Sequence, residues 1–227
     1  MSRATRMSAA APARVLLLDV DGVIVHPDPA HREAFETVLR SRWGMDGAHF
    51  QEQFFRANGE VLLCGRAHVR DLLPAFLAAS GVALGDDPAA VVEDFLHDWF
   101  IGRLPQTDDA VLQRVAGLRR RGIPVHLATN QDSMRAEQLW QATGLARHFD
   151  HMHVSARLGV AKPDAAFYGA AEAATVELCG ALGPSDILFL DDKPENVEAA
   201  RRHGWRAALY ERIGDLDRAL AEHGLAG

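Results

Sequence analysis

Residues 14–22 read RVLLLDVDG, a short apolar run that ends in two aspartates and a glycine. Both faces of the run are apolar, which is typical of a strand buried in a parallel sheet. The Asp21-Gly22 pair that follows it supplies turn chemistry. Other segments repeat this form at 124–129, 186–191 and 206–210, and a weaker one, at 151–155, is expected at a sheet edge.

Helical patterns alternate with these runs, at residues 108–121, 134–143, 163–178 and 194–203. The first ends in three arginines before Gly122, and a cationic last turn followed by glycine is a typical helix end. The third has a proline in its first turn, where proline is well tolerated. The alternation predicts an α/β fold with a doubly wound parallel sheet.

The residues between the first two runs break this alternation. They show no convincing strand, and they carry helical patterns at 29–43, 48–57, 68–80 and 88–101. We expect an all-helical cap domain at 25–104, a catalytic core at 14–24 and 105–227, and a flexible tail at 1–13. The aromatic residues of the cap are expected to form its core instead of stacking on a ligand: Trp43, Phe54, Phe55, Phe95, Trp99 and Phe100. Side chains that could line the cleft are His26, Arg66, His68 and Arg70.

The composition excludes several classes of protein. The chain has 31 acidic residues against 24 Lys and Arg, a formal charge of −7, which argues against a protein that grips nucleic acid. It does not exclude a small phosphorylated substrate. No apolar run approaches the roughly 18 residues that cross a bilayer, so no membrane association is expected. Cys64 and Cys179 are far apart and in no CxxC pattern, which favours free thiols and a cytoplasmic location.

Polar side chains gather where the predicted strands end, which is where open α/β sheets bind ligands. They are Asp19, Asp21, Thr129, Asn130, Lys162, Asp191 and Asp192. Asp19 and Asp21 point to the same side of an extended segment, and they would repel each other unless a cation intervenes. Mg²⁺ fits, because it prefers carboxylates, waters and phosphate oxygens. Taken singly, each aspartate is well explained as a cap or turn residue, and Lys162 as a solvated loop residue.

Two further interpretations concern phosphate and metal binding. Thr129 can donate its hydroxyl, and the backbone N–H groups after it are expected to open a helix, which would make a phosphate cradle. A lysine at this end of the sheet can offset the charge of a phosphoryl group and a carboxylate. His151 and His153 share a face of the weak strand and could suggest a metal pair, but a structural role is favoured because no third ligand is near in the sequence.

In this order and at these separations, the motifs Asp19-Val20-Asp21-Gly22, Thr129-Asn130, Lys162-Pro163 and Asp191-Asp192 resemble those of the haloacid dehalogenase-like (HAD) hydrolase superfamily. The helical insert resembles the first type of cap domain in that superfamily, on a Rossmann-like core. The segments LLLDVDGVIV, FDHMHVSARLGVAKPDAAFY and ILFLDDKPENVEAARRHGW are similar to the branch that holds sugar-phosphate phosphatases and the phosphatase domain of soluble epoxide hydrolases. The resemblance covers residues 14–210.

The resemblance implies a role for each matching residue. Asp19 would be the nucleophile that forms an aspartyl-phosphate, and Asp21 the general acid and base, with its backbone carbonyl on the metal. Asp192 would bind Mg²⁺, with Asp191 helping directly or through water. Thr129 and the Asn130 N–H would bind the phosphoryl group, and Lys162 would orient Asp19. Asn196 would lie just behind the metal ligands.

The implied activity is that of a Mg²⁺-dependent phosphoric monoester hydrolase acting on a small phosphorylated metabolite, as a monomer or homodimer. A sugar phosphomutase of the same family would return the phosphoryl group to sugar. A 2-haloacid dehalogenase is disfavoured, because dehalogenases of this family lack the second acid of the first motif, here Asp21. A receiver-like signalling domain lacks a helical insert after its first strand, and a catalytically idle binding protein would not need every one of these groups. The sequence does not name the substrate.

Overall fold

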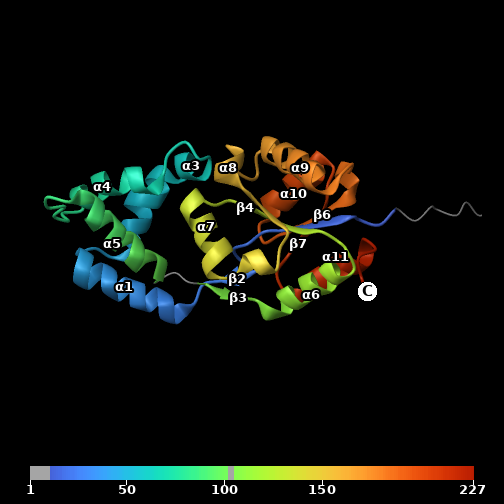
Figure 1. Ribbon diagram of the computed structural model, residues 1–227, viewed down its shortest axis with the longest axis horizontal. Coiled ribbons are helices and arrows are strands. Elements are labelled where there is room, and N and C mark those ends of the chain that lie inside the picture. Colours follow the sequence, from blue (N-terminus) through green and yellow to red (C-terminus); the bar gives the residue numbers. More distant parts are fainter. Residues whose placement is uncertain (1–10, 102–104) are drawn as a thin grey trace, which may run out of the picture.

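A five-stranded parallel sheet, in the order β5-β4-β1-β6-β7, forms the centre of one lobe of the molecule (Figure 1). Its strands are β1 (Val15–Leu18), β4 (Val125–Thr129), β5 (His151–Val154), β6 (Ile187–Asp191) and β7 (Arg206–Leu209). The computed structural model describes residues 11–101 and 105–227. Residues 1–10 of the expected tail and the expected end of the cap at 104 lie outside the described residues. The expected tail is too long at its end, because Ala13 is buried in the core and its N–H donates to the His223 carbonyl at 2.9 Å. The predicted α/β fold is confirmed, and β5 is an edge strand as expected.

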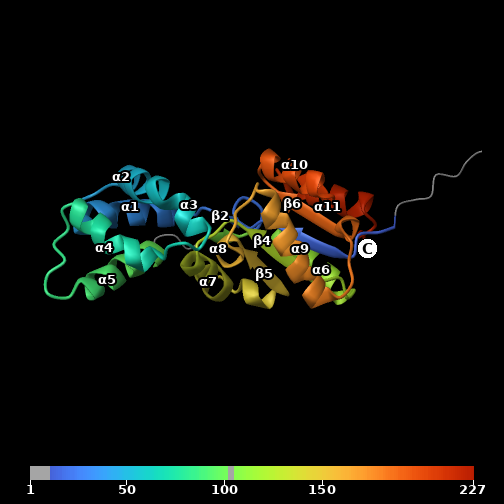
Figure 2. The ribbon, with the colours of Figure 1, turned by 90° about the horizontal axis from the view of Figure 1, so that it is seen from above.

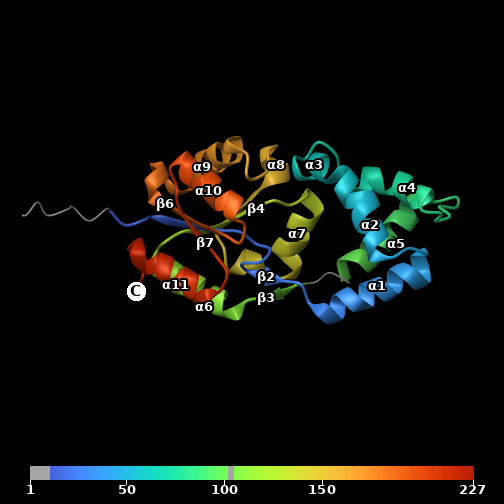
Figure 3. The same ribbon diagram turned by 180° about the vertical axis from the view of Figure 1, so that it is seen from behind.

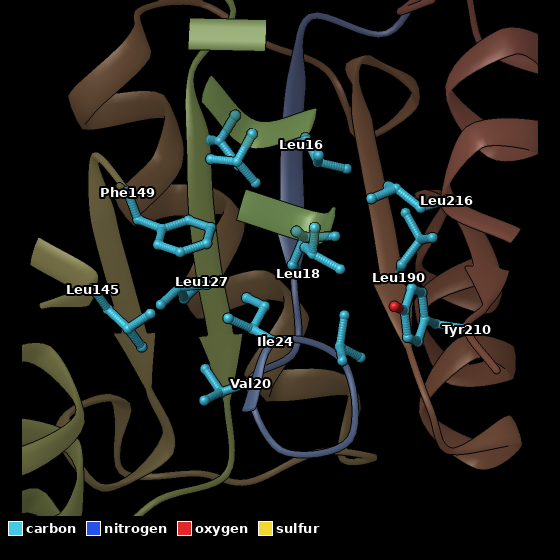
Figure 4. Packing of buried hydrophobic residues seen from close by; sticks show 14 of the residues in the cluster. Leu16, Leu18, Val20, Ile24, Leu127, Leu145, Phe149, Leu190, Tyr210 and Leu216 are labelled. Atoms are coloured by element: carbon cyan, nitrogen blue, oxygen red, sulfur yellow. The ribbon is translucent and has the colours of Figure 1, made fainter. Parts of the chain in front are cut away.

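Helices cover both faces of the sheet. α6 (Asp109–Arg120), α7 (Ser133–Ala142) and α11 (Ile213–Glu222) pack on the face of Leu16 and Leu18, whereas α9 (Ala165–Cys179) and α10 (Pro194–His203) pack on the face of Val15 and Leu17. Figure 4 shows the first face, where Leu18, Leu127, Leu190 and Leu216 gather. Strands that are apolar on both sides are therefore buried between two helical layers.

Three core helices differ from the prediction. α9 begins at Ala165 and is capped by the Asp164 side chain, so Pro163 precedes the helix instead of starting it. α11 was not predicted, and neither was the four-residue α8 (Ser155–Leu158) that follows β5. The short 3₁₀ turns η2 (Leu145–Arg147) and η3 (Pro184–Asp186) complete the core.

The inserted residues form a second, all-helical lobe with its own hydrophobic core. Its helices are α1 (Pro29–Trp43), α2 (Gly47–Phe50), the π-helical η1 (Gln51–Arg56), α3 (Ala57–Leu63), α4 (Val69–Ala79) and α5 (Pro88–Ile101). Trp43, Phe54, Phe95 and Trp99 are buried, while Phe55 and Phe100 pack partly buried against them, as expected for a cap core. The helix predicted at 48–57 is instead a run of three segments through a π turn.

A small antiparallel ribbon corrects the expectation that residues 25–104 hold no strand. β2 (Val25–His26) pairs with β3 (Gln106–Thr107) where the chain leaves and re-enters the core. Two-residue strands are too short to give a recognisable alternation of apolar and polar residues. No helix in the described part of the chain combines the length and the apolar character needed to cross a bilayer.

The helical lobe approaches the core through α3, which lies beside α8 (Figure 3). Figure 2 shows α7 and α8 at the end of the core that faces this lobe. The Gln138 side chain of α7 donates to the Phe100 carbonyl at 2.9 Å. Gly65 adopts φ +64°, and a Cβ there would overlap the carbonyl oxygen of Ala156. A glycine is therefore required at this contact between the two lobes.

A buried pair of histidines joins β4 to β5 on the α9 face. Nδ1 of His126 lies 3.2 Å from Nε2 of His153, which is also 3.1 Å from the Thr175 hydroxyl. Burial, reinforced by the neighbouring histidines, lowers the pKa of His126 to about 4 and that of His153 to about 3. His126 is a neighbour of His151 and His153 that the sequence did not reveal. In the described ranges these imidazoles do not belong to a candidate metal group, and the structural role expected for His151 and His153 stays a prediction.

Replacing His153 by Gln is expected to make the protein less sensitive to acid. The unfolded chain binds a proton at His153 below about pH 6.5, whereas the folded chain does not until much lower pH, so stability falls as the pH drops through this window. When the pH is lowered from 7.5 to 5, the free energy of unfolding should fall in both proteins, but by about 2 kcal/mol less in His153→Gln than in the wild type. Urea unfolding at the two pH values measures this, with the exposed His97→Gln as control. Identical pH dependence in both variants would contradict the expectation.

Candidate active site

Four buried polar side chains converge at the carboxyl edge of the sheet. Asp19 follows β1, Thr129 ends β4, Asp191 ends β6, and Lys162 lies in the loop between α8 and α9. Their exposed fractions are 6%, 1%, 0% and 5%, respectively. β1 pairs with both β4 and β6, so the parallel register brings these strand ends together. Lys162 is therefore buried, and the alternative interpretation of it as a solvated loop residue is wrong.

Lys162 links the two carboxylates. Its Nζ lies 2.9 Å from Oδ1 of Asp19 and 2.6 Å from Oδ2 of Asp191, and it donates to the Ala128 carbonyl at 2.8 Å. Burial acts to lower the pKa of Lys162, but Asp19 and Asp191 outweigh it and raise that pKa above its ordinary value. The lysine is therefore a permanent cation that holds Asp19 in place.

Asp19 is only partly compensated by this lysine. Burial raises the pKa of Asp19 to about 6; Lys162 acts to lower it and Asp191 to raise it further. An additional cation beside Asp19 would favour its ionised form. One more positive charge beside Asp19 would therefore be electrostatically favourable.

Asp19, Asp191 and Asp192 form a group that could hold a metal ion, with ligand oxygens within 4.8 Å of one another. Oδ1 of Asp192 is buried and has no hydrogen-bond partner. Burial, and then Asp191, raise the pKa of Asp192. Gly22 gives this carboxylate its space, since a Cβ there would lie 2.6 Å from Oδ2 of Asp192. An orphaned carboxylate oxygen in an all-oxygen group fits a hard divalent cation such as Mg²⁺.

Asp191 differs from Asp192 because protein donors already occupy both of its oxygens. Asn196 donates to Oδ1 and Oδ2 at 2.9 and 3.0 Å, and the Lys193 N–H donates to Oδ1 at 2.9 Å. Lys162 also donates a hydrogen bond to Oδ2 of Asp191. Asn196 thus contacts Asp191, and this arrangement suits Asp191 to orienting Lys162 more than to binding an ion directly.

The helix expected at 134–143 is present as α7 and starts one residue earlier, but the backbone N–H groups directly after Thr129 do not open it. α7 begins at Ser133, capped by Asp132, so the N–H groups that follow Thr129 belong to a loop. One of them, that of Gln131, is taken by the Ser155 hydroxyl at 3.1 Å. The Asn130 side chain has a contact that the sequence did not suggest: it bonds both the N–H and the carbonyl of Lys162, each at 2.8 Å.

Asp21 points away from the acidic group and toward α7. Its side chain is 57% exposed, and it is not part of the cluster that could hold a metal. Gln131 donates to Oδ2 of Asp21, and the guanidinium of Arg135 lies 3.7 Å from Oδ1. Gln131 and Arg135 are functional candidates that the sequence did not single out, and both closely follow Thr129-Asn130: Gln131 lies in the loop and Arg135 in the first turn of α7.

Two hollows between the lobes open beside Asp21. The smaller, of about 350 Å³, is lined by Asp21, Gln131, Asp132 and Arg135 from the core and by Gln51, Phe55, Gly59, Leu62, Leu63 and Trp99 from the cap. The other, of about 430 Å³, shares Asp21, Gln51 and Arg135 with it. None of the four residues expected to line the cleft borders either hollow. Arg66 pairs with Glu60 and Arg70 with Glu93, whereas Phe55 and Trp99 border the smaller hollow as well as the cap core.

Comparison with known proteins gives one family match and several distant relatives. A family model described as a haloacid dehalogenase-like hydrolase matches residues 13–204. Bifunctional epoxide hydrolase 2 of Rattus norvegicus is 27% identical over 218 residues, which cover 92% of this chain and 38% of that protein. Validoxylamine A 7'-phosphate phosphatase of Streptomyces hygroscopicus subsp. limoneus is 25% identical over 202 residues, or 84% of this chain and 82% of the relative. The chain spans about two-fifths of the length of the first curated relatives that it matches.

Solved structures share the fold at low identity. A 2-haloacid dehalogenase from Pseudomonas syringae pv. Tomato gives a TM-score of 0.68 at 17% identity, covering 92% of this chain and 98% of that one. A mutant HAD family enzyme from Bacteroides thetaiotaomicron, in complex with magnesium and inorganic phosphate, gives 0.63 at 16% identity, covering 87% and 93%. Both alignments extend over nearly the whole length of the solved structures, so the fold is shared over most of this chain.

Proposed function

Because the chain belongs to the haloacid dehalogenase-like hydrolase family, we propose that it is a Mg²⁺-dependent phosphatase of a small phosphorylated metabolite. The observation that carries the proposal is the difference in burial and contacts between Asp19 and Asp21. Asp19 is buried and held by Lys162, whereas Asp21 is half-exposed and borders both hollows between the lobes. This contrast supports a role for Asp19 as the nucleophile that attacks the phosphoryl group, and for Asp21 as the group that exchanges protons with the leaving group.

The metal belongs to the same proposal. Asp19, Asp192 and the backbone carbonyl of Asp21 would hold Mg²⁺, which neutralises charge on phosphoryl oxygens when it is bound. The orphaned Oδ1 of Asp192 supports this assignment. The relative from Bacteroides thetaiotaomicron, which holds magnesium and inorganic phosphate, gives the choice of ion further support.

The proposed first step transfers the phosphoryl group to the enzyme. A carboxylate oxygen of Asp19 attacks phosphorus, a new bond forms between them, and the ester P–O bond breaks. Asp21 gives its proton to the departing ester oxygen, so the leaving group departs as an alcohol. Lys162 keeps Asp19 oriented, and the Thr129 hydroxyl donates to a phosphoryl oxygen.

The second step returns the enzyme to its starting state. Water attacks the phosphorus of the aspartyl-phosphate, Asp21 takes a proton from that water, and the bond to Asp19 breaks to release inorganic phosphate. Asp21 is therefore protonated again for the next turnover. The amide of Gln131 and the guanidinium of Arg135, which both face Asp21, would hold it in position for the two proton transfers.

A panel of phosphate esters tests this function. Wild-type protein with Mg²⁺ should release inorganic phosphate from at least one small ester, and a chelator should abolish the release. A product in which the phosphoryl group has moved to another position of a sugar would instead indicate the phosphomutase. Halide release from 2-haloacids without phosphate release would overturn the proposal in favour of the dehalogenase, whose fold this chain shares.

The contact at Gly65 yields a prediction for the cap. Gly65→Ala should lower kcat/KM for a phosphate ester by about ten- to a hundred-fold, because the added Cβ overlaps Ala156 and displaces the cap from the active site. Gly81→Ala is the matched control: Gly81 has φ +83°, yet a Cβ there meets nothing within 4 Å. Steady-state kinetics on both variants measure the difference. Equal losses would mean that backbone strain, and not the seating of the cap, causes the effect.

A further inference from the structure

Arg135 stands where the two hollows between the lobes meet. It borders both of them, together with Asp21 and Gln51. Its side chain is only 11% exposed, and its NH2 group lies 3.7 Å from Oδ1 of Asp21. The same guanidinium reaches the Gln138 side chain at 3.3 Å. A nearly buried cation thus lies directly beside the proposed general acid.

The guanidinium of Arg135 borders both hollows, and the Asp21 carboxylate lies 3.7 Å from it, beyond hydrogen-bond distance. The Asp132 carboxylate caps the N-terminus of α7, where it accepts hydrogen bonds from the N–H groups of Met134 and Arg135. A further anion that entered the hollow would therefore be stabilised by this guanidinium.

The position of Asp21 fixes which part of a substrate would supply that anion. Asp21 must contact the ester oxygen, so the atoms next to that oxygen on the leaving group lie close to Arg135. A carboxylate whose own carbon is the first or second beyond the ester carbon can form paired hydrogen bonds with a guanidinium. The cap side of the smaller hollow is largely apolar, from Phe55, Leu62, Leu63 and Trp99, and its volume of about 350 Å³ suits a short chain.

We propose that Arg135 is a specificity-determining residue that binds a carboxylate on the leaving group, and that the substrates are phosphate monoesters of short hydroxy acids. The inference rests on the proposed phosphatase function. It adds to that function a chemical class of substrate and the side chain that selects it. A neutral polyol phosphate would leave Arg135 without an anionic ligand, and such esters are the competing class.

Two matched pairs of esters test the inference. Phosphoglycolate is compared with 2-hydroxyethyl phosphate, and 3-phosphoglycerate with glycerol 3-phosphate, so that each pair differs by a carboxylate in place of a hydroxymethyl group. In at least one pair, wild-type protein should prefer the carboxylate member by about ten-fold or more in kcat/KM. Arg135→Gln should bring that preference to within about three-fold of unity, and Arg135→Lys should restore part of it.

The ratio within a pair separates specificity from general damage. Any loss that Arg135→Gln causes through Asp21 falls on both members alike and cancels. Arg157→Gln is the matched control, since Arg157 is 48% exposed on α8 and pairs with Glu137 at 3.3 Å; it should keep the wild-type preference. Hydrolysis of both members without preference, or a preference that survives in Arg135→Gln, would overturn this inference alone. Failure to release phosphate from every ester, including p-nitrophenyl phosphate, would overturn the phosphatase function along with it.

Discussion

Asp19→Asn is expected to lower kcat for phosphate-ester hydrolysis by about 10⁴-fold or more, because a neutral amide cannot attack phosphorus. The fold should survive the change. Lys162 keeps its contacts to Asp191 and to the Ala128 carbonyl, at 2.6 and 2.8 Å. Burial also raises the pKa of Asp19 to about 6, so a neutral side chain is tolerated at this position.

Phosphate release and thermal unfolding, measured on the same preparation, separate these two expectations. The exposed Asp71 of α4 offers a control that removes one carboxylate elsewhere, and Asp71→Asn should keep full activity. Mg²⁺-dependent hydrolysis within about ten-fold of wild type in Asp19→Asn would contradict the assignment of the nucleophile.

Lys162→Met is expected to have the largest effect on stability. It removes a buried cation from between two buried carboxylates, Asp19 and Asp191, and leaves both uncompensated. Breaking a buried ion pair from one side costs about 3–5 kcal/mol. For a chain of this length that corresponds to a fall in Tm of roughly 6–20 °C.

The chain offers a close control for this experiment, because Lys193 is its second and last lysine. Lys193 is exposed, so Lys193→Met should leave Tm almost unchanged. Adding Mg²⁺ should raise the Tm of Lys162→Met by more than that of wild type, because the ion would restore positive charge beside Asp19. An unchanged Tm in Lys162→Met would mean that the buried ion pairs contribute little to the folded state.

The sheet was largely predictable because its strands are buried on both faces. A continuous apolar run such as residues 15–18, followed by polar residues, is typical of such a strand and also marks its carboxyl end. The predicted site residues met at one edge for the same reason, since parallel strands in register end together. Lys162 was harder, because only the folded loop shows that Asn130 binds its backbone and places its amine between two carboxylates.

The remaining features depend on contacts between segments that are distant in sequence. Gln131 and Arg135 acquire a partner in Asp21 only when α7 packs beside the exit of β1. His126 and His153 come into contact only because β4 pairs with β5 in the sheet. The π turn of η1 and the two-residue strands β2 and β3 leave no periodic pattern. α11 does carry a helical pattern, in Leu216, Ala219 and Leu220, and it was simply missed.

The central claim is that a phosphoryl group passes through Asp19, and trapping that intermediate tests it most directly. Asp21→Asn should slow the hydrolysis of the phosphoenzyme, whereas an aryl phosphate labelled with ³²P still phosphorylates Asp19, since its leaving group needs no proton. After acid quenching and digestion, the account predicts label on the peptide that contains Asp19, and no label in Asp19→Asn. Label on another residue, or no protein-bound label while wild-type protein still releases phosphate, would contradict it.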